Sequence, residues 1–166
     1  TKNQDEYVCQ VEEADIIVLA KSTGVLEFTT GTYGQEICVD SIIKGNEWID
    51  ENETCWIWRS YGMEVMDGQI VYRNVLNLMQ DDGTYLVFLN SNQLNQYRTE
   101  KEFQTASEYF GYLPIEGAKV QPIKENQRNV LYKEWSEIPV FISSEKVAAA
   151  WNEIAEMLLN KFEPDA

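Results

Sequence analysis

The chain has 166 residues, of which 28 are acidic and 13 basic, so its formal net charge is −15 at pH 7. That charge repels phosphate backbones and anionic lipid headgroups at long range, which disfavours nucleic-acid and membrane-surface binding through a broad basic patch. The sequence contains no histidine, so serine–histidine and cysteine–histidine nucleophilic mechanisms cannot be assembled within the chain.

The first predicted elements are an N-terminal arm and two strands. Residues 1–13 are polar and charged, and we expect them to form an arm or a short helical turn. Ala14–Ser22 contains the β-branched run IIV and ends at a Ser-Thr-Gly cluster, which predicts a first strand. Apolar and polar residues alternate in Gly34–Ile43, as in a half-buried antiparallel strand, and a Lys-Gly-Asn turn at 44–46 ends it.

Further strands are predicted in the middle of the chain. Thr54–Ser60 alternates, with two tryptophans on one face, and Gln69–Arg73 has the composition of a hairpin arm. Thr84–Leu89 follows an Asp-Asp-Gly turn and carries apolar side chains on both faces, which is typical of a central or barrel-closing strand. The next stretch, 91–106, is polar and rich in turn residues.

The last predicted elements are two strands and a helix. Tyr109–Leu113 and Ala118–Ile123 are the final strand candidates. A C-terminal helix over 144–162 is indicated by apolar residues at helical spacing, namely Val147, Trp151, Ile154, Leu158 and Phe162. With 44% hydrophobic residues, the chain is predicted to form one mainly β domain over 1–166, its strands lying within 14–123.

Three segments, in their order along the chain, resemble a known family. These segments are ADIIV at 14–18, IIKG at 42–45 and GTYLVFL at 83–89. Their order is similar to that of the netrin-like modules, which include the tissue inhibitors of metalloproteinases and many bacterial exported proteins. The resemblance implies a five-stranded OB-type β-barrel with a helix packed against it, an architecture that binds proteins, oligosaccharides and oligonucleotides.

The metalloproteinase inhibitors of this family coordinate the zinc of their target through an N-terminal cysteine. In this chain the first residue is Thr1 and the first cysteine is Cys9, so the resemblance carries over the barrel rather than the zinc-binding end. A protease-inhibitor-like function, which needs an exposed N-terminal edge able to enter an active site, is one alternative.

Tryptophan residues supply the candidate binding site. Trp56 and Trp58 lie two residues apart on a predicted strand, so their rings face the same side. Together with Trp48 and Tyr61, they predict a stacking platform for a sugar or a peptide. Such a pair also suits a hydrophobic core, and the solvent exposure of the rings distinguishes the two interpretations.

The three cysteines lack the CxxC spacing of metal and redox sites. If the second and third strands are neighbours, Cys38 and Cys55 can face one another and form a disulfide, which would leave Cys9 free. Buried free cysteines are the alternative interpretation. The acidic loop 50–53 lacks the alternating ligands and central glycine of a helix-loop-helix calcium site. We therefore predict no metal, no cofactor and no catalytic residue set.

These observations favour a non-catalytic binding module that engages a protein or a cell-envelope component through the tryptophan face or the barrel-end loops. A histidine-free hydrolase with paired carboxylates, such as Asp40 with Glu64 or Asp67, is the alternative from another class. No apolar run reaches the ~20 residues of a membrane helix. The chain begins at Thr1 rather than methionine, which fits a removed leader and an engineered start equally well. We expect an extracellular or cell-surface protein, free or lipid-anchored, whose leader is absent from this chain.

Overall fold

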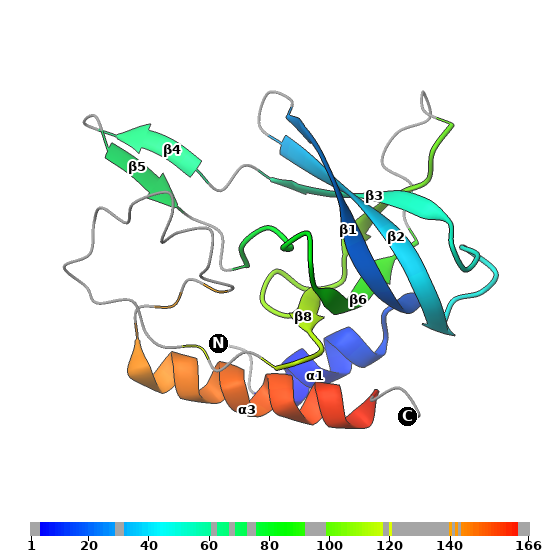
Figure 1. Cartoon of the computed structure of the whole chain (residues 1–166). Coiled ribbons are helices and arrows are strands. Elements are labelled where there is room, and N and C mark those ends of the chain that lie inside the picture. The colour runs from blue at the N-terminus through cyan, green and yellow to red at the C-terminus, as the bar shows by residue number, and fades with distance from the viewer. Residues whose placement is uncertain are drawn as a thin grey trace.

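The computed structural model is mainly β, with eight strands and two helices in the part of the chain that it describes (Figure 1). The described residues are 4–28, 32–60, 63–66, 69–72, 76–91, 99–117, 120, 140, 142 and 144–162. In chain order the elements are α1 (Gln4–Glu12), β1 (Ile16–Phe28), β2 (Thr32–Lys44), β3 (Thr54–Ser60), β4 (Met63–Met66), β5 (Gln69–Tyr72), β6 (Thr84–Asn90), β7 (Glu102–Thr105), β8 (Tyr112–Pro114) and α3 (Glu145–Lys161).

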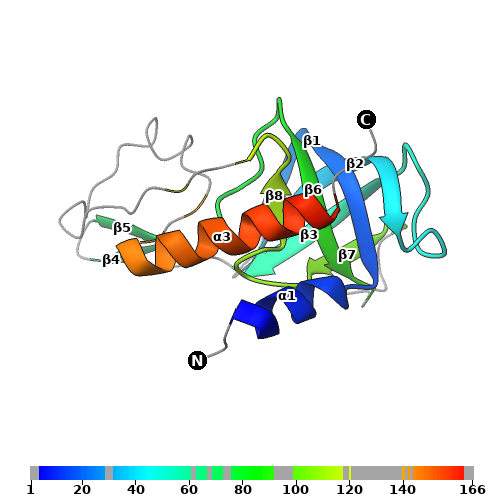
Figure 2. The ribbon, with the colours of Figure 1, turned by 90° about the horizontal axis from the view of Figure 1, so that it is seen from below.

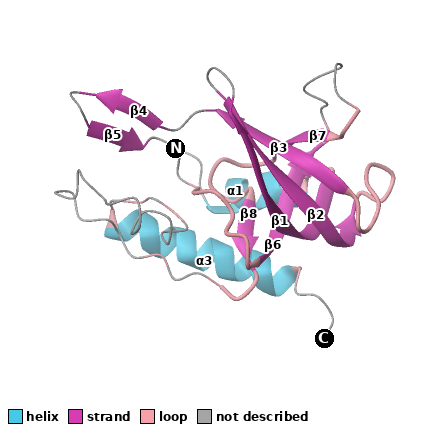
Figure 3. Cartoon of the chain, turned by 45° about the horizontal axis from the view of Figure 1, so that its top comes forward, coloured by secondary structure: helices cyan, strands magenta, loops and turns pink. Residues whose placement is uncertain are grey.

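Five strands close into a ring. Neighbours follow the order β1-β2-β3-β7-β6, and β6 then pairs with β1. The pairing of β3 with β7 is parallel, whereas the other pairs of the ring are antiparallel. β8 pairs with β6 beside β7, and β4 and β5 form a separate two-stranded sheet that stands away from the ring (Figure 3). The ring encloses the core, because one face of each strand then points inward.

The N-terminal segment is more ordered than the predicted arm. From Gln4 onward it forms the nine-residue helix α1, and Val11 at the end of this helix is fully buried. Two contacts join α1 to the C-terminal helix α3. The Gln4 side chain donates to Glu153 at 3.3 Å, and the Lys161 ammonium donates to the Glu12 carboxylate. Tertiary packing therefore stabilises a helix that is too short to be stable alone.

The first strand is longer than predicted. The Ser-Thr-Gly cluster at 22–24 was expected to end it, but β1 continues to Phe28. Gly24 has a φ of +83°, and the register between β1 and β2 shifts between Ser22 and Leu26. The glycine thus marks a bulge within a strand, because it adopts the left-handed conformation without steric cost.

Two other predicted boundaries change. β7 lies within the stretch 91–106 that was expected to be polar and turn-rich, and Phe103 points from it into the core. The strand predicted over Tyr109–Leu113 is β8, which begins at Tyr112. Of the residues predicted as a last strand over Ala118–Ile123, the structure describes Val120, which is buried and outside any strand.

The C-terminal helix is confirmed, and it lies across β6 and β8 on the same side as α1 (Figure 2). The Ser144 side chain accepts the N–H of Val147 at 3.4 Å, as expected of an N-cap. Trp151, Ile154 and Leu158 are buried as predicted, but Val147 is 48% exposed. Ala148 occupies the first core position instead, because it lies three residues before Trp151 on the same face.

Candidate functional site

Trp56 and Trp58 lie on the outer face of the ring. On β3, Cys55 precedes the two tryptophans and Ile57 lies between them, and both of these side chains are buried in the core. The two indole rings stack, with centroids 6.1 Å apart and an interplanar angle of 26°. Trp56 is 6% exposed, whereas Trp58 is half-buried. The structure therefore brings the predicted pair together, and Trp58 is the member that offers surface to a ligand.

A glycine on β2 makes room for Trp58. Gly34 is paired with Trp58 in the register of β2 and β3. A Cβ atom at Gly34 would lie 3.0 Å from each of Cε2, Cζ2 and Cη2 of the indole, so the ring lies against the β2 backbone. Glycine weakens a strand, and an aromatic neighbour that covers it compensates. The orientation of Trp58 is consequently fixed before any ligand arrives, which lowers the entropic cost of binding.

Gly34→Ala is expected to destabilise the protein by about 1–3 kcal/mol, because the added methyl group displaces the Trp58 ring. In a Trp58→Ala background the same substitution should cost almost nothing, since the space is then empty and alanine loses less backbone entropy than glycine. Urea denaturation of the four proteins measures this coupling. An equal cost in both backgrounds would show that the contact with Trp58 is not its cause.

The other two predicted aromatic residues do not extend this stack in the described structure. Trp48 lies in the turn after β2, where its N–H donates to Gly45 at 2.9 Å, and its side chain is 41% exposed. Its carbonyl accepts the Lys101 ammonium at 2.8 Å, and the Lys101 carbonyl accepts the Trp56 N–H at 2.9 Å. Lys101 thus ties the turn to β3. Tyr61 lies outside the described residues.

The acidic loop before β3 is occupied by internal contacts. Glu53 forms an ion pair with Lys101 at 3.0 Å and accepts the Asp50 N–H at 2.8 Å. Burial raises the pKa of Glu53, but these hydrogen bonds and the Lys101 charge outweigh it and lower the pKa overall. Among the described residues, no three cysteine, aspartate or glutamate side chains are arranged to hold a metal ion.

The predicted disulfide between Cys38 and Cys55 is wrong, because both thiols are free. In the register of β2 and β3, Cys55 is paired with Ile37 and Cys38 with Thr54. The first pair is buried, whereas Cys38 is half-buried and Thr54 is exposed. The two thiols therefore lie on opposite faces of the sheet. A difference of one residue in register is enough to turn them apart.

Cys55 is expected to resist modification in the folded protein. Burial raises its pKa to about 12, whereas Cys9 is exposed on α1, where a hydrogen bond to Glu13 raises its pKa less. A rise of three units lowers the reactive thiolate fraction about a thousandfold. Titration with Ellman's reagent at pH 8, comparing Cys9→Ser with Cys55→Ser, should show Cys55 reacting on unfolding. Rapid labelling of native Cys55 would contradict this.

Gln35, on the inner face of β2, holds the segment that crosses one end of the ring before β6. Its side-chain amide donates to the Met79 carbonyl at 2.9 Å and accepts the Met79 N–H at 3.0 Å. The same amide donates to the Ser22 hydroxyl at 3.2 Å. Two hydrogen bonds to one residue reproduce the pairing that a neighbouring strand would make. One side chain therefore satisfies both backbone groups of a buried residue.

Tyrosine and arginine side chains fix the rest of this segment. The Tyr112 hydroxyl donates to the Asn77 carbonyl, and the Tyr85 hydroxyl accepts the Gln80 N–H at 2.9 Å. Arg59 donates to the Tyr112 hydroxyl at 3.0 Å, and its guanidinium lies 5.6 Å from the centre of the Tyr112 ring. These groups make the end of the ring a rigid polar network.

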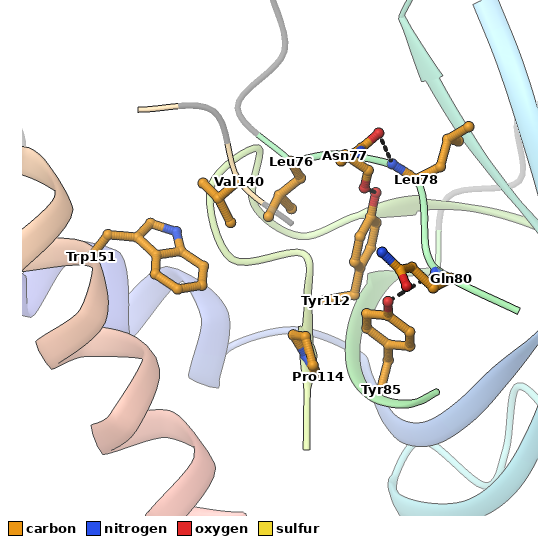
Figure 4. A pocket seen from close by; sticks show the side chains of 9 residues that line it. All are labelled: Leu76, Asn77, Leu78, Gln80, Tyr85, Tyr112, Pro114, Val140 and Trp151. Carbon is orange, nitrogen blue, oxygen red and sulfur yellow. Dashed lines mark hydrogen bonds between the residues drawn. The ribbon is translucent and has the colours of Figure 1, made fainter. Parts of the chain in front are cut away.

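A small cavity separates this network from α3, and Figure 4 shows its lining. Its volume of about 20 Å³ is enough for one water molecule and far too small for an organic ligand. The lining residues are Leu76, Asn77, Leu78, Gln80, Tyr85, Tyr112, Pro114, Val140 and Trp151. We therefore do not place the ligand site here.

Stability is expected to fall above about pH 9, because the ordinary pKa is 9.0 for the Cys55 thiol and 10.0 for the two tyrosines involved. Burial raises the pKa of Tyr112 and Tyr85 above the ordinary value of 10.0, and that of Cys55 to about 12. When a group has a higher pKa in the folded state than in the unfolded state, folding favours its protonated form. The stabilisation of the folded state is then complete at a pH below the unfolded-state pKa and is lost as the pH rises above it. Each group should cost up to about 1.4 kcal/mol per pH unit. Urea denaturation from pH 8 to pH 11 tests this, and Tyr85→Phe should reduce the slope; a flat profile would contradict it.

The far end of β1 carries exposed apolar side chains that the sequence pattern did not single out. Val25, Leu26 and Phe28 are 47%, 40% and 53% exposed, and we call these three residues the hairpin end. β6 pairs with β1 from Ile16 to Lys21, so the hairpin end projects past that pairing. Figure 1 shows this end of β1 and β2 on the opposite side of the ring from both helices. The sequence does carry a signal for this surface, because apolar residues continue along the chain beyond Gly24.

The carboxylates named for the hydrolase alternative do not form a described pair. Asp40 is exposed on β2, where it lies 3.9 Å from the Lys21 ammonium. The side chain of Glu64 and the whole of Asp67 lie outside the described residues.

The described helices include none that is both long and apolar enough to span a membrane. The fold is thus a closed five-stranded ring with two helices on one side, and with Trp58 and the hairpin end exposed elsewhere on its surface. Comparisons of the chain with protein-family models, with curated proteins and with solved structures found no match in any of the three.

Proposed function

We propose that this protein is a non-catalytic binding module of the extracellular space or cell envelope, built on an OB-like barrel similar to that of netrin-like modules. OB-folds are five-stranded Greek-key barrels, and they bind ligands on the face of their second and third strands and on the adjoining loops. The five-stranded ring supports the barrel, and its second and third strands are β2 and β3.

Trp58 is the observation that carries the proposal. It is half-buried on the outer face of β3 and lies against Gly34, so an aromatic surface is presented on a rigid scaffold. Its register partner on β7 is the exposed Gln104, and on β2 Glu36 is the register partner of Trp56, two positions from Gly34. Aromatic rings beside such polar groups suit a sugar or a peptide, which need apolar contact and hydrogen bonds together.

The proposal is tested with a printed oligosaccharide array and a panel of synthetic peptides. Trp58→Ala should abolish binding to whichever probe the wild-type protein retains, whereas Trp58→Phe should keep part of it. Trp48→Ala is the matched control, because it removes an exposed tryptophan from a different part of the surface. Thermal denaturation verifies that the variants fold. Binding unaffected by Trp58→Ala, or turnover of a probe, would reject the proposal, and turnover would favour the hydrolase.

A further inference from the structure

The hairpin end is the densest group of exposed apolar side chains in the described structure. Three of the eight large hydrophobic residues that are exposed there lie between Val25 and Phe28. The other five are spread over the chain: Ile43, Trp48, Ile115, Val147 and Met157. Single exposed apolar residues are ordinary on soluble proteins, but a contiguous group commonly marks a contact surface.

Carboxylates flank the base of the hairpin end. Asp81 accepts the Ser22 hydroxyl at 3.1 Å, and its carboxylate lies 3.6 Å from the position of a Cβ atom on Gly24. On the neighbouring strand, Glu36 accepts the Thr23 hydroxyl at 2.8 Å. Asp82 follows Asp81 and is exposed.

None of these three acids forms an ion pair with a residue that the structure describes. The partners of Asp81 and Glu36 are hydroxyl groups, which hydrogen-bond a carboxylate without neutralising it. Within the described residues, the ion pairs are made by other acids, Glu12, Asp40 and Glu53. Leu26 and Phe28, two residues apart on β1, share one face and form an apolar surface at whose edge these acids lie, which resembles the apolar core and polar rim of a protein interface.

We propose that the hairpin end docks a segment of a partner protein in which lysine or arginine residues flank apolar ones. This inference rests on the binding-module function and names the class of partner. The apolar side chains supply affinity by leaving water, and the carboxylates select and steer a cationic segment. A second copy of this chain fits poorly, because two chains that each carry a net charge of −15 repel one another. An anionic membrane is repelled for the same reason.

The test is an NMR titration of the ¹⁵N-labelled protein with two short synthetic peptides. Both carry the same valine, leucine and phenylalanine residues, with lysine at the polar positions of one and glutamate at those of the other. The lysine peptide should shift the amide signals of residues 25–28 and 33–36, and its affinity should fall as salt rises. The glutamate peptide should leave these signals in place.

Two sets of variants assign the effect. Leu26→Ser with Phe28→Ser should weaken binding of the lysine peptide about tenfold or more. Val147→Ser with Met157→Ser removes exposed apolar side chains from α3 and should leave it unchanged. Glu36→Gln with Asp81→Asn should flatten the dependence on salt. If the Leu26→Ser, Phe28→Ser double variant does not fold, the single variant Leu26→Ser is used to measure the loss of peptide binding.

Equal binding of both peptides, or shifts that survive the hairpin variants, would overturn the inference. A concentration-dependent dimer in analytical ultracentrifugation, lost with Leu26→Ser, would overturn it in favour of self-association. Failure of the binding-module proposal gives a different result, because that proposal depends on Trp58→Ala and on other probes. Ligand binding that is lost with Trp58→Ala but kept in the hairpin variants would retain the module and reject this docking site.

Discussion

Replacing Trp151 by alanine is expected to lower the free energy of unfolding by about 3–5 kcal/mol. The residue is buried where α3 meets the ring, and its indole stacks on Phe110 with centroids 5.6 Å apart and an interplanar angle of 16°. Its Nε1–H also donates to the Tyr109 carbonyl at 2.8 Å. Alanine would leave a cavity, lose the ring contact and orphan that carbonyl. Urea denaturation monitored by far-UV circular dichroism measures the loss.

Two controls separate packing from hydrogen bonding at this position. Trp151→Phe keeps an aromatic ring on Phe110 but removes the N–H group, so it should cost about 1–3 kcal/mol. Trp48→Ala removes a 41% exposed tryptophan and should stay within about 0.5 kcal/mol of the wild type. A loss below about 1 kcal/mol for Trp151→Ala would mean that α3 contributes little to the stability of the ring.

Gln35→Met is expected to cost about 2–4 kcal/mol. Methionine has a similar length, but it cannot replace the two hydrogen bonds that the amide makes with Met79. The N–H and carbonyl of Met79 would then be buried without partners, and each such group carries a penalty of about 1–3 kcal/mol. Chemical denaturation gives the total cost. Hydrogen exchange at the Met79 amide should accelerate beyond the rate that global unfolding predicts.

Ser22→Ala is the matched control for Gln35. It removes the hydroxyl that binds Gln35, Asp81 and the Gly24 N–H but leaves both bonds to Met79, so it should cost about 1–3 kcal/mol and leave exchange at the Met79 amide close to the wild-type rate. Unchanged exchange at Met79 in Gln35→Met would show that the segment over the end of the ring is held by Tyr85 and Tyr112 rather than by Gln35.

Long or strongly patterned elements could be predicted from sequence. β3 has the predicted bounds Thr54–Ser60, since strict alternation over seven residues is a strong strand signal. The apolar residues at helical spacing over 144–162 identified α3 in the same way, because that pattern is also long and regular. β7 was missed because it is four residues long and places a single large apolar side chain, Phe103, in the core. The ring itself depends on pairings between distant segments, and local patterns do not record these.

The candidate site was predictable in part. Alternation correctly placed Trp56 and Trp58 on one face, because the side-chain period of a strand is fixed. It did not predict that Trp56 is buried, since burial depends on the surroundings of a strand in the fold. The disulfide between Cys38 and Cys55 does not form because of the strand register. Cys38 is paired with Thr54, one residue away from Cys55, and this register is set by the connection between β2 and β3.

The packing of α1 against α3 has a consequence for synthesis of the chain. Gln4 contacts Glu153 and Glu12 contacts Lys161, so each contact joins residues 149 positions apart. The hydrogen bonds between α1 and α3 therefore form only after α3 has been synthesised. Contacts of such long sequence separation slow folding, because a large loop must close before they form. Chains that stop before residue 145 would lack both of these hydrogen bonds, whereas the ring contacts of Tyr7 with Tyr109 and Phe110 would remain possible.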